Sequence, residues 1–149
     1  MAIEEDIQQT SFTNPYQKVF VNLMFTHNWL VAQHTRLLKP FCITREQYNV
    51  LRILRGQHPK PATVNLITER MLDKMSNASR LVDKLLVKKL VQRHVCPNDR
   101  RAVDVCITPE GLNLLAKLDV LHADWEKTFE NLTDEEADSL STLLDKLRG

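Results

Sequence analysis

Apolar residues recur three or four positions apart over most of this chain, a spacing that places them on one face of a helix. The pattern predicts helices over residues 15–38, 44–55, 62–69, 76–89, 109–125 and 133–147. Except for the helix from 62, each predicted helix has a capping residue at its first position or directly before it. The side chain of such a residue can accept a hydrogen bond from the first turn. These capping residues are Asn14, Thr44, Ser76, Thr108 and Thr133, and proline follows directly at positions 15 and 109.

Between the fourth and fifth predicted helices, the apolar period falls from 3.6 to about 2, which is typical of β-strands. Val91 and Val95 alternate with polar residues, and Val103 and Val105 repeat this pattern after a charged segment. We therefore expect a β-hairpin over residues 91–107. Two closely spaced helices followed by a hairpin form the winged helix-turn-helix layout, whose second helix enters the DNA major groove. The expected fold is mainly α with a small β-hairpin wing.

Length and composition indicate one folded unit. The chain has 149 residues, 43% of them hydrophobic, which suits a single core. No apolar run approaches the roughly 18 residues of a membrane span, and the acidic N-terminal segment lacks signal-peptide features. We therefore expect a cytoplasmic protein without membrane contact. The three cysteines, Cys42, Cys96 and Cys106, fit reduced thiols, and Cys96 and Cys106 lie at opposite ends of their hairpin strands, too far apart to bond directly. We interpret Cys42, beside Phe41, as a packed thiol, with an oxidant sensor as the alternative.

Charge is unevenly distributed along the chain, although its net charge is only +1. Residues 73–101 contain eight basic and three acidic side chains, whereas residues 119–149 contain three basic and nine acidic ones. The first region attracts a polyanion and the second repels it. The alternative interpretation is that solvated helix faces simply differ in sign.

Four short strings carry a resemblance to a known family. They are SRLVDKL at 79–85, KLV at 89–91, DRRA at 99–102 and ITPEG at 107–111. With these strings in this order, residues 43–118 resemble the MarR family of bacterial transcription regulators. The family commonly has glycine where this chain has Lys89, at a helix end that favours a left-handed backbone.

The resemblance also implies a domain organisation and an assembly. Residues 1–149 would form a single MarR-like domain, with dimerisation helices at 14–38 and 109–149 and a winged helix-turn-helix lobe at 41–108. The protein would be a homodimer that binds an inverted-repeat operator in double-stranded DNA and acts as a repressor. The apolar surplus in the last two helices predicts a dimer independently, because an exposed apolar face of that size is unfavourable in water.

Polar side chains on the predicted recognition helix, residues 76–89, are candidate DNA contacts. They are Ser76, Asn77, Ser79, Arg80, Lys84 and Lys88. Asn77 and Arg80 lie near the helix start, where side chains reach base edges, and the two serines suit phosphates or bases. Lys84 and Lys88 suit the phosphate backbone, because lysine is a flexible point charge. The alternatives are a solvated surface and a winged helix used only for protein contacts.

The tip of the predicted wing carries a second set of candidates. Here the resemblance implies that Arg101 enters the minor groove, that Asp99 orients it and that Arg100 contacts phosphate. An arginine in a narrow minor groove meets a concentrated negative potential. The wing would thus add an electrostatic contact beside the recognition helix.

Other chemistry is suggested only by the resemblance or is not expected. The family commonly binds small aromatic or phenolic anions, which makes Trp29, Arg36, Phe41 and Tyr48 candidate effector-binding residues. The alternative is that they are core aromatics and a solvated arginine. The sequence contains no phosphate-binding glycine loop, nucleophile elbow or complete metal-ligand spacing. We therefore expect no enzyme activity, no metal and no cofactor.

Overall fold

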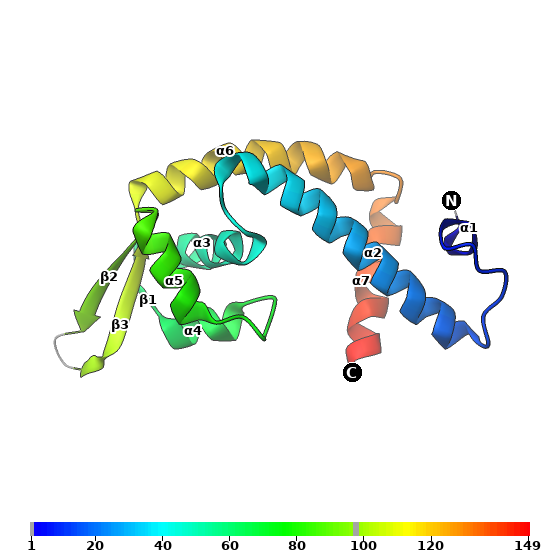
Figure 1. Cartoon of the computed structure of the whole chain (residues 1–149), viewed down its shortest axis with the longest axis horizontal. Helices are drawn as coiled ribbons and strands as arrows, with labels where there is room; N and C mark the ends of the chain where they lie inside the picture. The colour runs from blue at the N-terminus through cyan, green and yellow to red at the C-terminus, as the bar shows by residue number, and fades with distance from the viewer. Residues whose placement is uncertain (1, 97–98) are drawn as a thin grey trace. The chain divides into compact units, whose positions relative to one another are not determined.

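The computed structural model describes residues 2–96 and 99–149, and the side chains of residues 2–94 and 103–149. The chain forms two compact units, Met1–Tyr48 and Asn49–Gly149, each with its own internal packing. Both units are mainly helical, and the second also contains a small antiparallel sheet (Figure 1). The predicted fold class, mainly α with a small wing, is confirmed.

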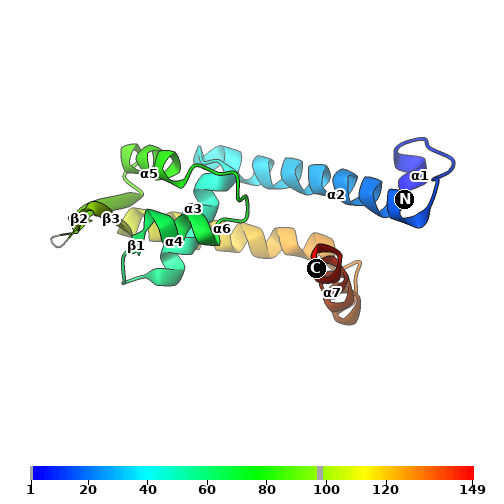
Figure 2. The same ribbon diagram turned by 90° about the horizontal axis from the view of Figure 1, so that it is seen from below.

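The first unit contains α1 (Ile3–Asp6), α2 (Pro15–Leu38), the 3-10 helix η1 (Lys39–Phe41) and the start of α3 (Arg45–Gln57). α2 begins where predicted because Asn14 Oδ1 accepts a hydrogen bond from the backbone N–H three residues later, at 2.9 Å. α1, which was not predicted, is joined to the first turns of α2 by an ion pair between Lys18 and Glu4 (Figure 2). At the start of α3, Thr44 and Gln47 form reciprocal hydrogen bonds of 3.1 Å, which completes a capping box.

The second unit contains β1 (Ala62–Thr63), α4 (Val64–Arg70), α5 (Ala78–Val87), β2 (Val91–Cys96), β3 (Asp99–Ile107), α6 (Pro109–Glu126), η2 (Lys127–Phe129) and α7 (Asp134–Arg148). The predicted caps of the last two helices are present. Thr108 Oγ1 accepts from the Gly111 N–H at 3.1 Å, and Thr133 forms a capping box with Glu136. Local capping chemistry therefore determines where both helices begin.

The sheet has three strands, in the order β1-β3-β2. β2 and β3 form the predicted hairpin, and Ala62 of β1 lies opposite Val105 of β3. The prediction of a helix from residue 62 was wrong at its start: Ala62 and Thr63 are strand, and α4 begins at Val64 with Thr63 as its cap. A two-residue strand is too short to show a period of 2, so the apolar pattern does not reveal it.

The core of the second unit is built from α3, α4, α5, β3 and α6. The most deeply buried side chains of this core are at most 1% exposed. They include Leu51, Leu54, Ile67, Val82, Leu85, Val105, Leu115 and Leu118. The two α5 residues in this set fix which side of that helix faces the solvent. None of the helices in the described ranges is long and apolar enough to cross a membrane.

Candidate nucleic-acid interface

The N-terminal end of α5 is capped by Asn77, so the prediction that Ser76 caps it was wrong. Asn77 Oδ1 accepts from the Arg80 N–H at 3.0 Å. Ser76 belongs to the preceding turn, where its own N–H donates to the Asp73 carbonyl at 3.1 Å. The helix ends just before Lys88, its C-cap, and is therefore shorter than predicted at both ends.

The polar side of α5 is exposed along its length. Ala78, Val82 and Leu85 are buried, whereas the exposed side chains are Asn77, Ser79, Arg80, Lys84 and Lys88. Arg80, Lys84 and Lys88 follow one another at intervals of four residues, which places them along one side of the helix. Ser76 differs, because it is half-buried and its Oγ atom has no hydrogen-bond partner among the described residues. Five of the six candidates on this helix are thus available to a ligand.

An ion pair connects α5 to the first strand of the wing. Arg93 Nη1 of β2 donates to Asp83 Oδ1 of α5 at 2.9 Å, and both side chains are about half exposed. A pair this open to solvent contributes at most about 1 kcal/mol. It joins the exposed side of α5 to the wing.

The turn before α5, around the polar residues Asp73 and Lys74, also presents two large apolar side chains to solvent. Leu72 is 88% exposed and Met75 is 92% exposed. The turn is held by hydrogen bonds from the Leu72 N–H to Asn49 Oδ1 and from the Met75 N–H to Asp73 Oδ1, both at 2.9 Å. Sequence reasoning missed these residues, although two apolar residues in an otherwise polar turn were a visible signal.

The C-terminal end of α5 closes in a Schellman turn. The Lys89 N–H donates to the Leu86 carbonyl at 3.0 Å and the Leu90 N–H to the Leu85 carbonyl at 3.1 Å. Lys89 has a φ of 60°, so this lysine adopts the left-handed conformation expected at the family's glycine position.

The same turn is joined to the start of α6. Thr108 Oγ1 donates to the Lys89 carbonyl at 2.9 Å, and the Thr108 N–H donates to the Leu90 carbonyl at 3.1 Å. Gly111 makes this approach possible, because a Cβ atom there would lie 2.4 Å from the Leu90 carbonyl oxygen. The recognition helix and α6 therefore share one closely packed junction.

A second link joins α3 to α6 within this unit. Arg55 donates two hydrogen bonds to the Asp119 carboxylate, at 2.7 and 3.0 Å. These hydrogen bonds, together with the positive charge of Arg55, hold the pKa of Asp119 below its usual range.

The side chains at the tip of the wing lie outside the described residues. The predicted roles of Asp99, Arg100 and Arg101 therefore stay predictions. In the hairpin backbone, Cys106 lies opposite Gln92 and Cys96 lies opposite Asp99. This register agrees with the expectation that the two cysteines do not face each other.

The four predicted effector residues lie in the first unit, and Trp29 lines one of the two hollows described there. Trp29 is 42% exposed and lines a hollow of about 450 Å³ with Ile3, Asp6 and Phe25 among others. Tyr48 is buried and packs edge-on against His34, with ring centroids 5.3 Å apart, which matches the alternative of a core aromatic. Arg36 is exposed and Phe41 is half-buried.

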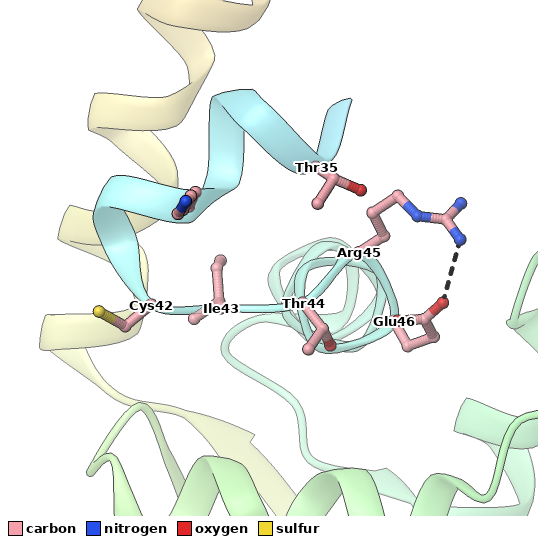
Figure 3. Close-up of a pocket in the computed structure, with 7 residues that line it drawn as sticks. Thr35, Cys42, Ile43, Thr44, Arg45 and Glu46 are labelled. Carbon is pink, nitrogen blue, oxygen red and sulfur yellow. Dashed lines mark hydrogen bonds and ion pairs between the residues drawn. The ribbon is translucent and has the colours of Figure 1, made fainter. Parts of the chain in front are cut away.

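A second hollow in the first unit, of about 430 Å³, is lined by none of the four (Figure 3). Its lining residues are Thr35, Lys39, Cys42, Ile43, Thr44, Arg45 and Glu46. Arg45 and Glu46 form an ion pair of 3.4 Å along one edge. The interpretation of Cys42 as a packed thiol was wrong, because this residue is exposed. Its φ of 54°, at the end of η1, gives the local reason: the chain turns sharply there before α3.

Comparisons with known proteins agree with this architecture. A MarR-family sequence profile matches residues 43–102. A MarR transcription factor from Planctomyces limnophilus is 29% identical, covering 91% of this chain and 98% of its own, with a TM-score of 0.68. The sequence over residues 43–102 and the winged-helix fold over most of the chain are thus similar to those of MarR-family transcription regulators.

Two further solved structures are similar to this chain. MepR of Staphylococcus aureus, solved in complex with DNA, is 26% identical, with 92% of this chain and 96% of MepR covered and a TM-score of 0.72. BpsR of Bordetella bronchiseptica, whose DNA binding is regulated by 6-hydroxynicotinic acid, is 23% identical. Its TM-score is 0.74, with 89% of this chain and 99% of BpsR covered.

Proposed function

We propose that this protein is a MarR-family regulator that binds a specific operator as a homodimer, inserts α5 into the major groove and represses transcription. The observation that carries the proposal is the exposed polar side of α5, with Arg80, Lys84 and Lys88 along it and the opposite side buried in the core. The similarity to DNA-bound MepR supports the same mode of binding. Arg80 near the helix start reads a base, and the lysines neutralise phosphates.

The wing completes the proposed interface. Arg101 enters the minor groove, Asp99 orients its guanidinium and Arg100 binds phosphate. The support is the hairpin itself, together with the ion pair between Arg93 of β2 and Asp83 of α5. An arginine in this position favours sites flanked by A·T pairs, whose minor groove is narrow.

Dimerisation is proposed through helices 14–38 and 109–149, with residues 41–108 forming the DNA-binding lobe. Each unit leaves large apolar side chains in solvent: Tyr16, Val19, Phe20, Met24 and Phe25 on α2, and Leu140, Leu143 and Leu147 on α7. A second copy of the chain would cover these faces, at a gain of about 25 cal/mol for each Å² of apolar surface removed from water. A truncation after Asn131 should therefore give a monomer or an aggregate.

An aromatic or phenolic anion is the proposed effector. BpsR responds to such a molecule, and Trp29 and Arg36 are exposed on α2. The chain has two tryptophans, so in a Trp125→Phe variant the fluorescence reports Trp29 alone. Saturable quenching by 6-hydroxynicotinic acid, lost in Arg36→Ala and accompanied by weaker operator binding, is expected. Fluorescence and operator affinity that both ignore a panel of aromatic acids would remove the effector from the proposal.

Selection from random duplex DNA, followed by anisotropy titrations, tests the DNA-binding proposal. The selected site should be an inverted repeat with half-sites about one helical turn apart. Arg80→Ala should weaken operator binding by about 1 to 3 kcal/mol per half-site and relax base preference at one symmetric position. Lys88→Ala should weaken operator and scrambled DNA alike and lower the salt slope by about 0.9 for each phosphate that the protein no longer neutralises. Lys146→Ala, a cation on α7, is the matched control.

One outcome would favour a different function. If Arg80→Ala, Lys88→Ala and Lys146→Ala all bind operator and scrambled duplex like the unaltered protein, the basic side of α5 is a solvated surface. A winged helix that contacts only proteins then becomes the better account.

A further inference from the structure

The turn between α4 and α5 exposes two apolar side chains more fully than any other large apolar residue in the described part of the chain. Met75 is 92% exposed and Leu72 is 88% exposed, whereas Tyr16 and Val87 follow at 84%. Met71, in the same turn, is only 2% exposed and belongs to the core. The turn thus divides its apolar residues between the interior and the solvent.

The exposure of Leu72 and Met75 is imposed by a hydrogen-bonded backbone. The Leu72 N–H is held by Asn49 of α3 and the Met75 N–H by the Asp73 carboxylate, each at 2.9 Å. The Met71 N–H donates to the Ile67 carbonyl at 3.0 Å, at the end of α4. Such fixed backbone positions leave the two side chains no route into the core, so their apolar surface is available to a ligand.

The surroundings indicate what this ligand is. Asp73 and Lys74 lie between the two apolar residues, and the Asp73 carboxylate accepts the Met75 N–H. The exposed cations Arg80 and Lys84 follow on α5, so this surface has a net positive charge. The N-terminal end of α5 adds the positive end of its helix dipole. A surface that is cationic around a small apolar spot is complementary to a polyanion with apolar groups. The DNA major groove offers this combination, because phosphates line it and each thymine exposes a C5-methyl group.

Met75 also has the right place in the chain. It lies two residues before Asn77, the N-cap of α5, and the N-terminal residues of a recognition helix contact base edges. Methionine is flexible and polarisable, which suits contact with a methyl group. We propose that Met75, with Leu72 beside it, contacts thymine C5-methyl groups and so selects thymine next to the base read by Arg80. This inference rests on the proposed function.

Deoxyuridine substitution tests the proposal directly, because uracil differs from thymine only in lacking the C5-methyl group. Each thymine pair of the selected inverted repeat is replaced symmetrically, and affinities are measured by anisotropy for the unaltered protein and for Met75→Ala. At one symmetric position, removing the methyl groups should lower the affinity of the unaltered protein for DNA about fourfold per half-site. This is the change in affinity expected from burying one carbon atom. The affinity of Met75→Ala for thymine DNA should be lower than that of the unaltered protein by about the same factor. Its affinity for uracil DNA should be no lower than its affinity for thymine DNA.

Two matched variants control the experiment. Val87→Ala removes a similarly exposed apolar side chain from the C-terminal end of α5, and it should keep both the affinity and the thymine preference. Leu72→Ala should lose part of the preference. Urea unfolding should be unchanged in all three variants, because each side chain is at least 84% exposed.

The outcomes separate this inference from the function on which it rests. If the unaltered protein prefers operator to scrambled DNA but binds thymine and uracil sites equally, the thymine contact is wrong and the proposed function stands. Equal losses by Met75→Ala on thymine and uracil DNA would also overturn the contact. If the unaltered protein does not distinguish operator from scrambled DNA, both proposals fall.

Discussion

Lys89 occupies a backbone conformation that L-residues with a side chain rarely adopt. Its φ is 60°, and its N–H closes the Schellman turn at the end of α5. The Lys89 carbonyl is fixed as well, by the Thr108 hydroxyl at 2.9 Å. Because the turn is bonded on both sides, the lysine cannot relax to a negative φ without breaking the junction between α5 and α6. Lys89→Gly should therefore stabilise the protein.

The expected gain follows from two opposing terms. A left-handed conformation costs a residue with a Cβ atom about 1 to 2 kcal/mol, and glycine does not pay this cost. Glycine also makes the unfolded chain more flexible, which removes about 0.4 to 1 kcal/mol of the gain. The net stabilisation should be about 0.5 to 1 kcal/mol. The lysine side chain is exposed, so no packing is lost.

Urea unfolding followed by circular dichroism measures this difference, at one protein concentration because a dimer's stability depends on concentration. Lys89→Ala is the matched control, since it removes the charge but keeps the Cβ atom in the left-handed conformation. It should unfold within about 0.5 kcal/mol of the unaltered protein. If Lys89→Ala gains as much stability as Lys89→Gly, charge repulsion and not backbone strain is the cause. A loss of stability in Lys89→Gly would refute the reasoning altogether.

Four further substitutions test other parts of the second unit. Asp119→Asn removes the ion pair with Arg55 and should lower the free energy of unfolding by at most about 1 kcal/mol, because the pair is partly exposed. Because the pKa of Asp119 is lowered, this contribution is present above the unfolded-state pKa and is lost as pH falls through the folded-state pKa, so the variant should show a flatter acid limb in pH-dependent unfolding. Gly111→Ala should cost about 1 to 3 kcal/mol, because its Cβ atom would meet a backbone carbonyl at 2.4 Å, whereas Gly56→Ala, with open space around it, should stabilise α3 by about 0.5 to 1 kcal/mol in the same assay. Asn77→Ala should cost about 1 kcal/mol in thermal unfolding through loss of the α5 cap.

Helix starts were predictable from sequence wherever a following proline or a capping-box partner marked the capping residue. Asn14, Thr44, Thr108 and Thr133 cap the helices that they were expected to cap, because capping depends on residues within one turn. At α5, the adjacent residues Ser76 and Asn77 could both cap the helix, and Asn77 does so. Tertiary structure decided it: the preceding turn is fixed from α3, and it takes up the amide of the first candidate.

The candidate site likewise contains some features that could be predicted from the sequence and others that could not. The exposed side of α5 follows from a period of 3.6, so Arg80 and Lys84 could be assigned to it from sequence. Met75 could be seen in the sequence as an apolar residue in a polar turn, but its exposure depends on a turn that is held from α3 and could not be assigned from the local pattern. The burial of Tyr48 against His34 likewise depends on a contact between α3 and α2, which the local sequence pattern does not show.

The bonding around α5 limits how this regulator can be controlled. Its N-terminal end is capped by Asn77, its C-terminal turn is hydrogen-bonded to Thr108 at the start of α6, and Asp83 is paired with Arg93 of the wing. Reshaping α5 would break these contacts and expose the junction around Gly111, which already has no room for a Cβ atom. Moving α5, the wing and the start of α6 together breaks none of them. A signal that weakens DNA binding should therefore act by changing the spacing of the two α5 helices in a dimer, and any ligand that does so must bind the two spacings unequally.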